Sequence, residues 1–103
     1  MLSIHFDAER EWWVSGRIFE RLFQSALDSG KMPSKLEQWL HVADANGGLD
    51  LSLLDPSEAS ELVTVLRDAA LRDLAKLGDV DAESEDGAYR DSLLKMLKVS
   101  QIG

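Results

Sequence analysis

The segment from Asp55 to Gly78 constrains the fold of this chain more than any other part, because it encodes both ends of one long helix. Asp55 can accept hydrogen bonds from the first free backbone N–H groups, and Pro56 suits the first helical position, where no N–H donor is needed. Glu58 completes a capping-box pattern, and Gly78 can adopt the left-handed conformation that ends many helices. Apolar residues recur at helical spacing in between, so we predict an amphipathic helix over residues 56–77.

Three further helices are predicted from apolar spacing and end signals. The first covers residues 8–29 with Asp7 as its cap, and the second covers residues 35–45 after a capping-box pattern. The last covers residues 88–99 and follows an acidic connection over residues 79–87, which we expect to be solvated. Because 103 residues suffice for one continuous core, we predict a mainly α, compact, four-helix bundle-like single domain.

Two short segments have a different pattern. Residues 2–6 and 49–53 alternate apolar and polar side chains, which is the period of a half-buried strand. They are candidates for a small two-stranded β element, 2–6 with 49–53, although an isolated ribbon needs a packing surface to be stable. In the alternative interpretation residues 2–6 form an extended arm on the bundle, and Asp50 caps a single helical turn.

The net charge of −8 is unevenly distributed along the chain. Residues 41–103 contain six Lys or Arg against thirteen Asp or Glu, which places −7 of the total there. A field of this sign repels phosphate groups, so direct binding to nucleic acid or to an anionic membrane is disfavoured. The charge is compatible with a basic protein partner, and its simplest explanation is solubility.

The first residues of the chain and the lengths of its apolar runs indicate in which cellular compartment we expect the protein. The start of the chain lacks the basic residues and the apolar stretch of a secretory signal, and no apolar run approaches the roughly 20 residues that span a bilayer. Cys is absent, which excludes disulfides and thiolate chemistry. We expect a cytoplasmic protein.

No pattern in the sequence is specific for catalysis. Phosphate-binding loops, a dinucleotide fingerprint and zinc-ligand clusters are missing, so we predict no catalytic residue, no cofactor and no metal site. The enzyme alternative is a carboxylate-dependent or metal-assisted hydrolase that uses some of His41, Asp44 and the acids of residues 79–86. Metal titration would separate it from a non-catalytic protein.

One face of the predicted first helix is the candidate recognition surface. Its three arginines are spaced by seven and four residues, so on a helix they form one stripe away from the main apolar face. Trp and Arg are enriched at binding hot spots. The stripe and its apolar border comprise Arg10, Trp13, Val14, Arg17, Ile18 and Arg21. Alternatively, the N-terminal arm covers Val14 and Ile18, and the arginines pair with nearby acids.

Asp73 is a candidate buried charge in the long helix. On the helical wheel it falls among apolar residues near the C-terminus, where a carboxylate is unfavourable unless it is paired. Either a donor from another helix binds it, or the apolar stripe has reached solvent at that turn. We predict a small acidic protein-binding module without catalytic activity, such as an adaptor, an inhibitor or an immunity-like protein. A structural homo-oligomer, including a homodimer, is the other non-enzymatic alternative.

Overall fold

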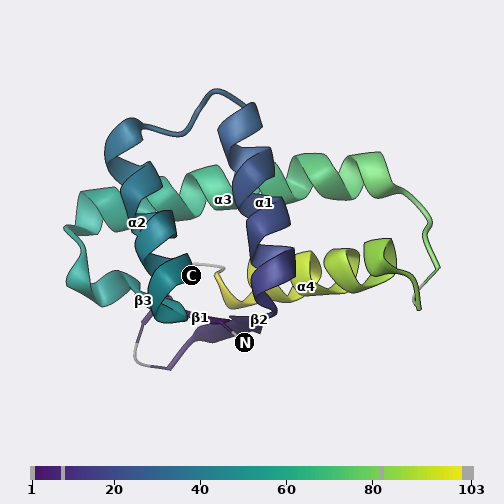
Figure 1. Cartoon of the computed structure of the whole chain (residues 1–103), viewed down its shortest axis with the longest axis horizontal. Coiled ribbons are helices and arrows are strands. Elements are labelled where there is room, and N and C mark those ends of the chain that lie inside the picture. Colours follow the sequence, from purple (N-terminus) through teal and green to yellow (C-terminus); the bar gives the residue numbers. More distant parts are fainter. Residues whose placement is uncertain (1, 8, 82, 101–103) are drawn as a thin grey trace.

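The computed structural model describes residues 2–7, 9–81 and 83–100 (Figure 1). Within these residues three short strands and four α-helices surround one hydrophobic core. A 3-10 turn, η1 (Leu51–Leu53), connects the third strand to the third helix. In chain order the other elements are β1 (Leu2–His5), β2 (Glu11–Val14), α1 (Gly16–Asp28), α2 (Ser34–Asn46), β3 (Gly48–Asp50), α3 (Pro56–Leu77) and α4 (Glu85–Val99).

The sheet has the order β2-β1-β3, with β1 in the centre. β1 runs antiparallel to β2, and Ile4 faces Trp12 in this pair. β1 runs parallel to β3, and Ile4 faces Leu49 there. The expected pairing of the two alternating segments is confirmed for Ser3–His5 with Gly48–Asp50. It is wrong for residues 51–53, which form η1 with Asp50 as its cap, as the alternative interpretation expected. The sheet also has a third strand, β2, from a segment predicted to be helical.

The helix predicted over residues 8–29 is wrong in its first half. Residues Glu11–Val14 form β2, and the helix α1 begins only at Gly16. Ser15 is the cap of this shorter helix, because its Oγ accepts a hydrogen bond from the Ile18 N–H at 3.2 Å. Asp7 does not cap a helix but closes the turn between β1 and β2. Pairing with β1 therefore overrides the helical spacing of the apolar residues.

The other predicted helices are present with small shifts. α3 has the predicted bounds, with Asp55 as its cap and the positive φ of 58° at Gly78 as its end. α2 extends the predicted range by one residue at each end. α4 begins three residues early, because Ser84 caps it by accepting a hydrogen bond from the Gly87 N–H at 3.0 Å. The acidic connection is correspondingly shorter than predicted.

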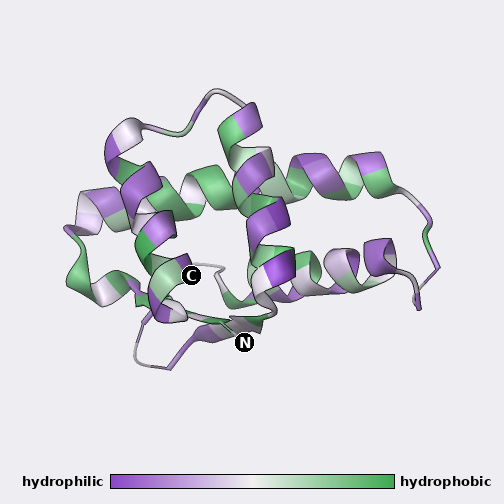
Figure 2. Ribbon diagram, in the orientation of Figure 1, coloured by the Kyte–Doolittle hydropathy of each residue, from purple (hydrophilic) through white to green (hydrophobic). Residues whose placement is uncertain are grey.

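The four helices do not confirm a four-helix bundle. α1 and α2 cross α3 at a steep angle, whereas α3 and α4 lie side by side (Figure 1). The sheet lies at one edge of the molecule and the helices lie on one side of it (Figure 1). Hydrophobic and hydrophilic residues alternate along each helix (Figure 2), as is typical of helices that bury one face against a core. No described helix is both long and apolar enough to cross a membrane.

The inner face of the sheet forms part of the core. Trp12 and Val14 on β2 are buried, as are Leu2 and Ile4 on β1 and Leu49 on β3. The indole Nε1–H of Trp12 donates a hydrogen bond to the Ser92 carbonyl of α4 at 3.0 Å. This bond ties the sheet to the last helix, so the side chains of the opposite, outer face are left toward solvent.

Candidate functional site

The outer face of the sheet carries two rows of side chains, because residues in register point to the same face. The first row contains Trp13, Ser3 and Gly48, and the second contains Glu11, His5 and Asp50. We call these six residues the outer sheet face. It combines one large aromatic side chain with a carboxylate, an imidazole and a second carboxylate in line.

Gly48 allows the backbone of β3 to lie close to that of β1, which places the β3 residue of each row beside its β1 residue. A Cβ atom at this position would lie 2.6 Å from the carbonyl oxygen of Ser3, which is too close for any other residue. β1 and β3 therefore approach closely only because residue 48 has no side chain. Trp13 lies at the other end of this row, in register with Ser3.

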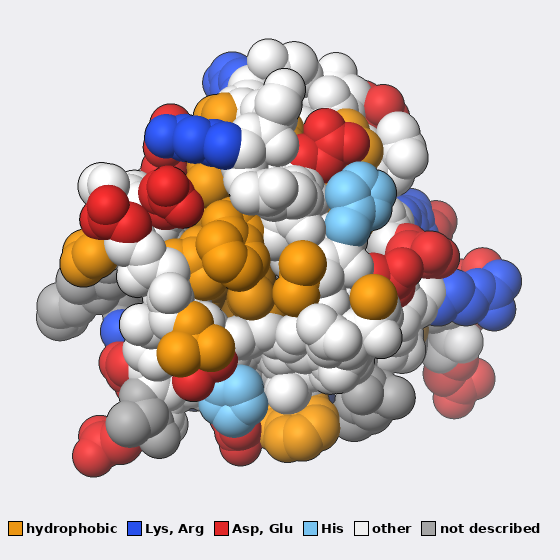
Figure 3. Space-filling model, turned by 60° about the vertical axis from the view of Figure 1, so that its left-hand side comes forward, with side chains coloured by type: hydrophobic (Ala, Val, Ile, Leu, Met, Phe, Trp, Pro, Cys, Tyr) orange, Lys and Arg blue, Asp and Glu red, His pale blue; other side chains and the backbone are white. Residues whose placement is uncertain are grey.

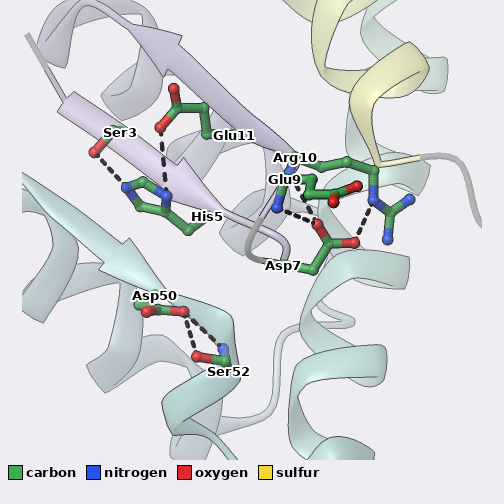
Figure 4. Close-up of polar contacts among 8 residues, drawn as sticks. All are labelled: Ser3, His5, Asp7, Glu9, Arg10, Glu11, Asp50 and Ser52. Atoms are coloured by element: carbon green, nitrogen blue, oxygen red, sulfur yellow. Dashed lines mark hydrogen bonds and ion pairs between the residues drawn. The ribbon is translucent and has the colours of Figure 1, made fainter.

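His5 lies at the centre of the polar contacts (Figure 4). Its Nε2 is 3.4 Å from Ser3 Oγ, and its Nδ1 is 3.4 Å from Glu11 Oε2. Asp50 is in register with His5 on the other side. The Ser52 hydroxyl and backbone N–H both donate to Asp50 Oδ1, which lowers the pKa of this carboxyl below its usual value. Asp50 therefore keeps its negative charge beside the imidazole.

The turn between β1 and β2 is held by Asp7 (Figure 4). Its Oδ1 accepts the backbone N–H groups of Glu9 and Arg10, both at 2.9 Å, and its Oδ2 accepts Arg10 Nε at 2.6 Å. The bond from Glu9, followed by those from Arg10, lowers the pKa of the Asp7 carboxyl. The acidic end of the hairpin is thereby ordered next to the outer sheet face.

The order Ser3, His5, Glu11 resembles the nucleophile, base and acid of a hydrolytic triad, but the surroundings do not complete one. Such chemistry needs backbone donors free to stabilise an oxyanion beside the nucleophile. The Ser3 N–H already donates to the Gly47 carbonyl at 3.2 Å. The residues are also partly exposed, so water weakens the electrostatic effects on which a triad depends. The arrangement is better suited to binding through charge and hydrogen bonds.

Trp13 is the principal apolar group of the outer sheet face. It is 53% exposed, whereas its neighbour Trp12 is 2% exposed. The backbone of Trp13 is paired with Ser3 of β1, so the indole is presented by a fixed strand and not by a loop. A rigid aromatic side chain loses little conformational entropy when a partner covers it.

The predicted arginine stripe does not form, because Arg10 lies outside the helix, in the turn. Val14 points into the core and Trp13 to the outer sheet face. Arg17 pairs with Glu85 at 3.3 Å, and Arg21 pairs with Asp86 at 2.9 Å. Contact between acids of α4 and the arginines of α1 is what the alternative interpretation of this region expected.

The helical part of that candidate set lines a separate shallow cleft between α1 and α4. The cleft has a volume of about 220 Å³ and is lined in part by Arg17, Ile18, Arg21 and Tyr89. Arg21 also lies over the Tyr89 ring, with its guanidinium carbon 4.1 Å from the ring centroid. A role of these residues in partner binding stays a prediction, and it concerns a different surface from Trp13.

Asp73 receives hydroxyl donors from two other helices. Ser25 Oγ of α1 donates to its Oδ1 at 2.8 Å, and Tyr89 Oη of α4 donates to its Oδ2 at 2.6 Å. Arg72 donates to the Ser25 hydroxyl and carbonyl. Burial, followed by the bond to Asp73, raises the pKa of the Tyr89 phenol. The Asp73 carboxylate thus links α3 to α1 and α4 by hydrogen bonds. Asp73 itself is half-buried.

The residues of the enzyme alternative are not gathered into a metal site. His41 lies 3.5 Å from Glu37 on α2, and it shares an open cleft with Asp44. Within residues 2–7, 9–81 and 83–100 no group of three or more His, Cys, Asp or Glu residues could hold a metal ion. Position 82 of the predicted acidic connection, an alanine, lies outside the described residues.

A second exposed apolar region lies on another side of the molecule. Figure 3 shows hydrophobic side chains gathered on the face that α2 and the start of α3 present, with acidic groups around them. Leu53 of η1 is 79% exposed and Val42 of α2 is 38% exposed. This region competes with Trp13 as a surface for a partner, but Leu53 is carried by a short turn, whereas Trp13 is carried by a paired strand.

The sequence predicts Trp13 as a candidate contact residue. It does not predict that Ser3, His5, Glu11 and Asp50 lie on the same face. Ser3 and His5 alternate with apolar residues, which is visible in the sequence. The position of Glu11 depends on a β1–β2 register that helical spacing conceals. The available signal for a strand here is the pair Trp12-Trp13. In a strand, adjacent side chains point to opposite faces, so one indole can enter the core while the other faces solvent.

The comparisons with known proteins give no identification. No protein-family model matches the chain, and searches of curated proteins and of solved structures gave no significant match. Its function must therefore be inferred from its own residues.

Proposed function

We propose that this chain is a protein-binding module without catalytic activity, and that it contacts its partner through the outer sheet face. The observation that carries the proposal is the exposure of Trp13, 53%, on a hydrogen-bonded strand. Tryptophan is among the residue types most enriched at binding hot spots. An indole held this way offers a large apolar area that is already ordered before binding.

The charges around Trp13 favour a basic partner. Glu11 and Asp50 lie on the same face, and the chain as a whole carries −8. Opposite charges steer two proteins together and fix their orientation, so association should be fast at low salt and slower at high salt. An arginine or lysine of the partner can also pack on the indole face as a cation–π pair.

The test compares two exposed apolar side chains of similar accessibility. Trp13→Ala removes the proposed anchor, and Leu94→Ala removes a side chain of α4 that is 50% exposed. The wild-type chain and both variants are used to capture proteins from the native cell, and the retained protein is purified for measurement of its Kd. We expect Trp13→Ala to weaken binding by about 2 kcal/mol or more, as for the loss of a hot spot, and Leu94→Ala to leave it unchanged.

Two controls accompany this test: the helical content of each variant, which shows that it is folded, and the dependence of association on salt concentration. Circular dichroism should give the same spectrum for the wild type and both variants, because neither side chain belongs to the core. An affinity that is equal for the wild type and Trp13→Ala would remove the outer sheet face as the binding surface. Salt-independent association would remove electrostatic steering as its mechanism.

A further inference from the structure

The edge of β2 that faces away from β1 carries backbone groups in a regular pattern. In an antiparallel pair, hydrogen-bonded and non-hydrogen-bonded positions alternate. Phe6 N–H donates to the Arg10 carbonyl at 2.8 Å in the same register as the strands, which makes Trp12 and Val14 the hydrogen-bonded positions of β2. The N–H and C=O groups of Glu11 and Trp13 therefore point away from β1.

These outward groups have no partner within the described part of the chain. The backbone bonds beyond the regular elements include none to Glu11 or Trp13, and no described side chain bonds to their backbone. β2 is an outer strand of the sheet, since the order is β2-β1-β3. Such an edge is a template for another strand.

The edge of β3 is a poorer template than that of β2. β3 has three residues and runs directly into η1, and α2 ends at the residue before the turn that leads to it. Asp50 is engaged with Ser52 at its end. β2 has four residues, and its edge carries the exposed Trp13.

We propose that the partner contributes an extended segment, rich in lysine or arginine, that adds to the sheet as a fourth strand along β2. This inference rests on the proposed function and specifies its partner. Main-chain hydrogen bonds to Glu11 and Trp13 align the segment, and its alternate side chains lie over the outer sheet face. A cation there meets the Trp13 indole, and the next residue on that face meets the Glu11 carboxylate.

Charge distinguishes this occupant from a second copy of the chain. Pairing two β2 strands would bring together two molecules of net charge −8 and two Glu11 carboxylates at one edge. Like charges opposed across strands are destabilising. A basic segment is attracted to the Glu11 carboxylate at this edge, whereas a second copy of the chain is repelled by it.

The experiment uses a synthetic probe of defined chemistry. A capped seven-residue peptide with alternating lysine and threonine is added to the ¹⁵N-labelled chain, since threonine favours extended structure. A peptide with glutamate in place of lysine is the matched control. Two quantities are recorded: the chemical-shift changes of each amide and of the indole N–H groups, and the hydrogen-exchange rates of the amides of β2.

The proposal expects slower exchange at two alternate positions. The amides of Glu11 and Trp13 should exchange about tenfold more slowly or better with the lysine peptide, because they become hydrogen-bonded. The amides of Trp12 and Val14 are bonded to β1 already and should change little. The glutamate peptide should produce neither effect. Glu11→Gln should lower the affinity for the lysine peptide, and the same two amides should still be protected when the peptide is bound.

Each other outcome overturns the strand addition in a distinguishable way. Shifts at the Trp13 indole without amide protection would show recognition by side chains alone, which leaves the proposed function standing and ends this inference. No shifts at saturating peptide would exclude a basic extended segment. Protection of Glu11 and Trp13 before any peptide is added, together with a dimer in sedimentation, would identify the occupant as a second copy.

Discussion

Trp12 and Trp13 are adjacent in the chain and lie on opposite faces of β2. Trp12 is buried in the core, where its Nε1–H donates to the Ser92 carbonyl at 3.0 Å, and Trp13 is exposed on the outer sheet face. One indole therefore stabilises the fold, and the other is available to a partner. This division separates the effects of two substitutions that differ by one position.

Replacing each tryptophan should affect stability very differently. Trp12→Ala should lower the free energy of unfolding by about 3–5 kcal/mol, because it leaves a large cavity in the core. Trp13→Ala should change it by about 0.5 kcal/mol or less, since the side chain is mostly in solvent. Urea unfolding followed by circular dichroism measures both. Equal losses in the two variants would contradict the assignment of these faces.

Tyr89 should resist ionisation in the folded protein. It is the one tyrosine of the sequence, so the ultraviolet absorbance of ionised phenol in an alkaline titration reports on it alone. Burial and the bond to Asp73 raise its pKa. The native state thus holds the phenol proton more tightly than the unfolded chain does. This stabilisation is complete below the ordinary value of about 10 and declines as pH rises above it.

Two variants test the cause of the Tyr89 shift. Asp73→Ala removes the acceptor and its charge, and should lower the pKa of Tyr89 toward the ordinary value while burial still keeps it raised. Leu94→Ala, on the exposed side of α4, should leave it unchanged. Ionisation of the folded wild type at the ordinary pKa would show that the phenol is neither buried nor bonded to Asp73.

Gly48 should not tolerate a side chain. Gly48→Ala places a Cβ 2.6 Å from the Ser3 carbonyl oxygen, so β3 has to move away from β1, at a cost of about 1–3 kcal/mol. Gly16→Ala is the matched control, because a Cβ there meets nothing within 4 Å and alanine favours the helix. Thermal unfolding should give a lower Tm for the first variant and an equal or higher Tm for the second. The reverse order would disprove the close β1–β3 approach.

The hairpin and η1 should weaken in acid. Backbone and side-chain donors lower the pKa of both Asp7 and Asp50, so the native state binds their protons less tightly than the unfolded chain does. Their contribution is present above the ordinary value of about 3.9 and is lost as pH falls through the lower folded values. The double variant Asp7→Asn and Asp50→Asn should flatten the acid side of a plot of urea midpoint against pH. Asp68→Asn, on an exposed position of α3, should leave that slope intact.

Local signals in the sequence are sufficient for the elements whose ends carry their own caps. Asp55, Pro56 and Gly78 act within α3 itself, and the helix has the predicted bounds. Ser84 is hard to recognise as the cap of α4, because the acidic residues around it favour a solvated connection. Where a cap and an apolar face lie in one segment, the sequence determines the element without reference to the rest of the chain.

The strands could not be assigned in the same way, because pairing is not local. Glu11–Val14 has apolar residues at positions that also fit a helix with Phe19 and Leu22, and only β1 decides between the two. The alternation of the β3 segment is visible in the sequence, but its direction and its extent depend on the turn after α2. Consequently the sequence predicts Trp13 as a candidate contact residue, but it does not predict the charged row beside it.

Site-specific photo-crosslinking from position 13 is the most direct test of the outer sheet face as the binding surface. An aromatic photoreactive amino acid, which keeps a large ring in place of the indole, replaces Trp13, Leu53 or Leu94 in turn in the native cell, so that three exposed apolar sites are compared. We predict a covalent adduct with a basic protein from position 13 and none from position 94. An adduct from position 53 without one from position 13 would place the partner on the α2 side and contradict the proposal.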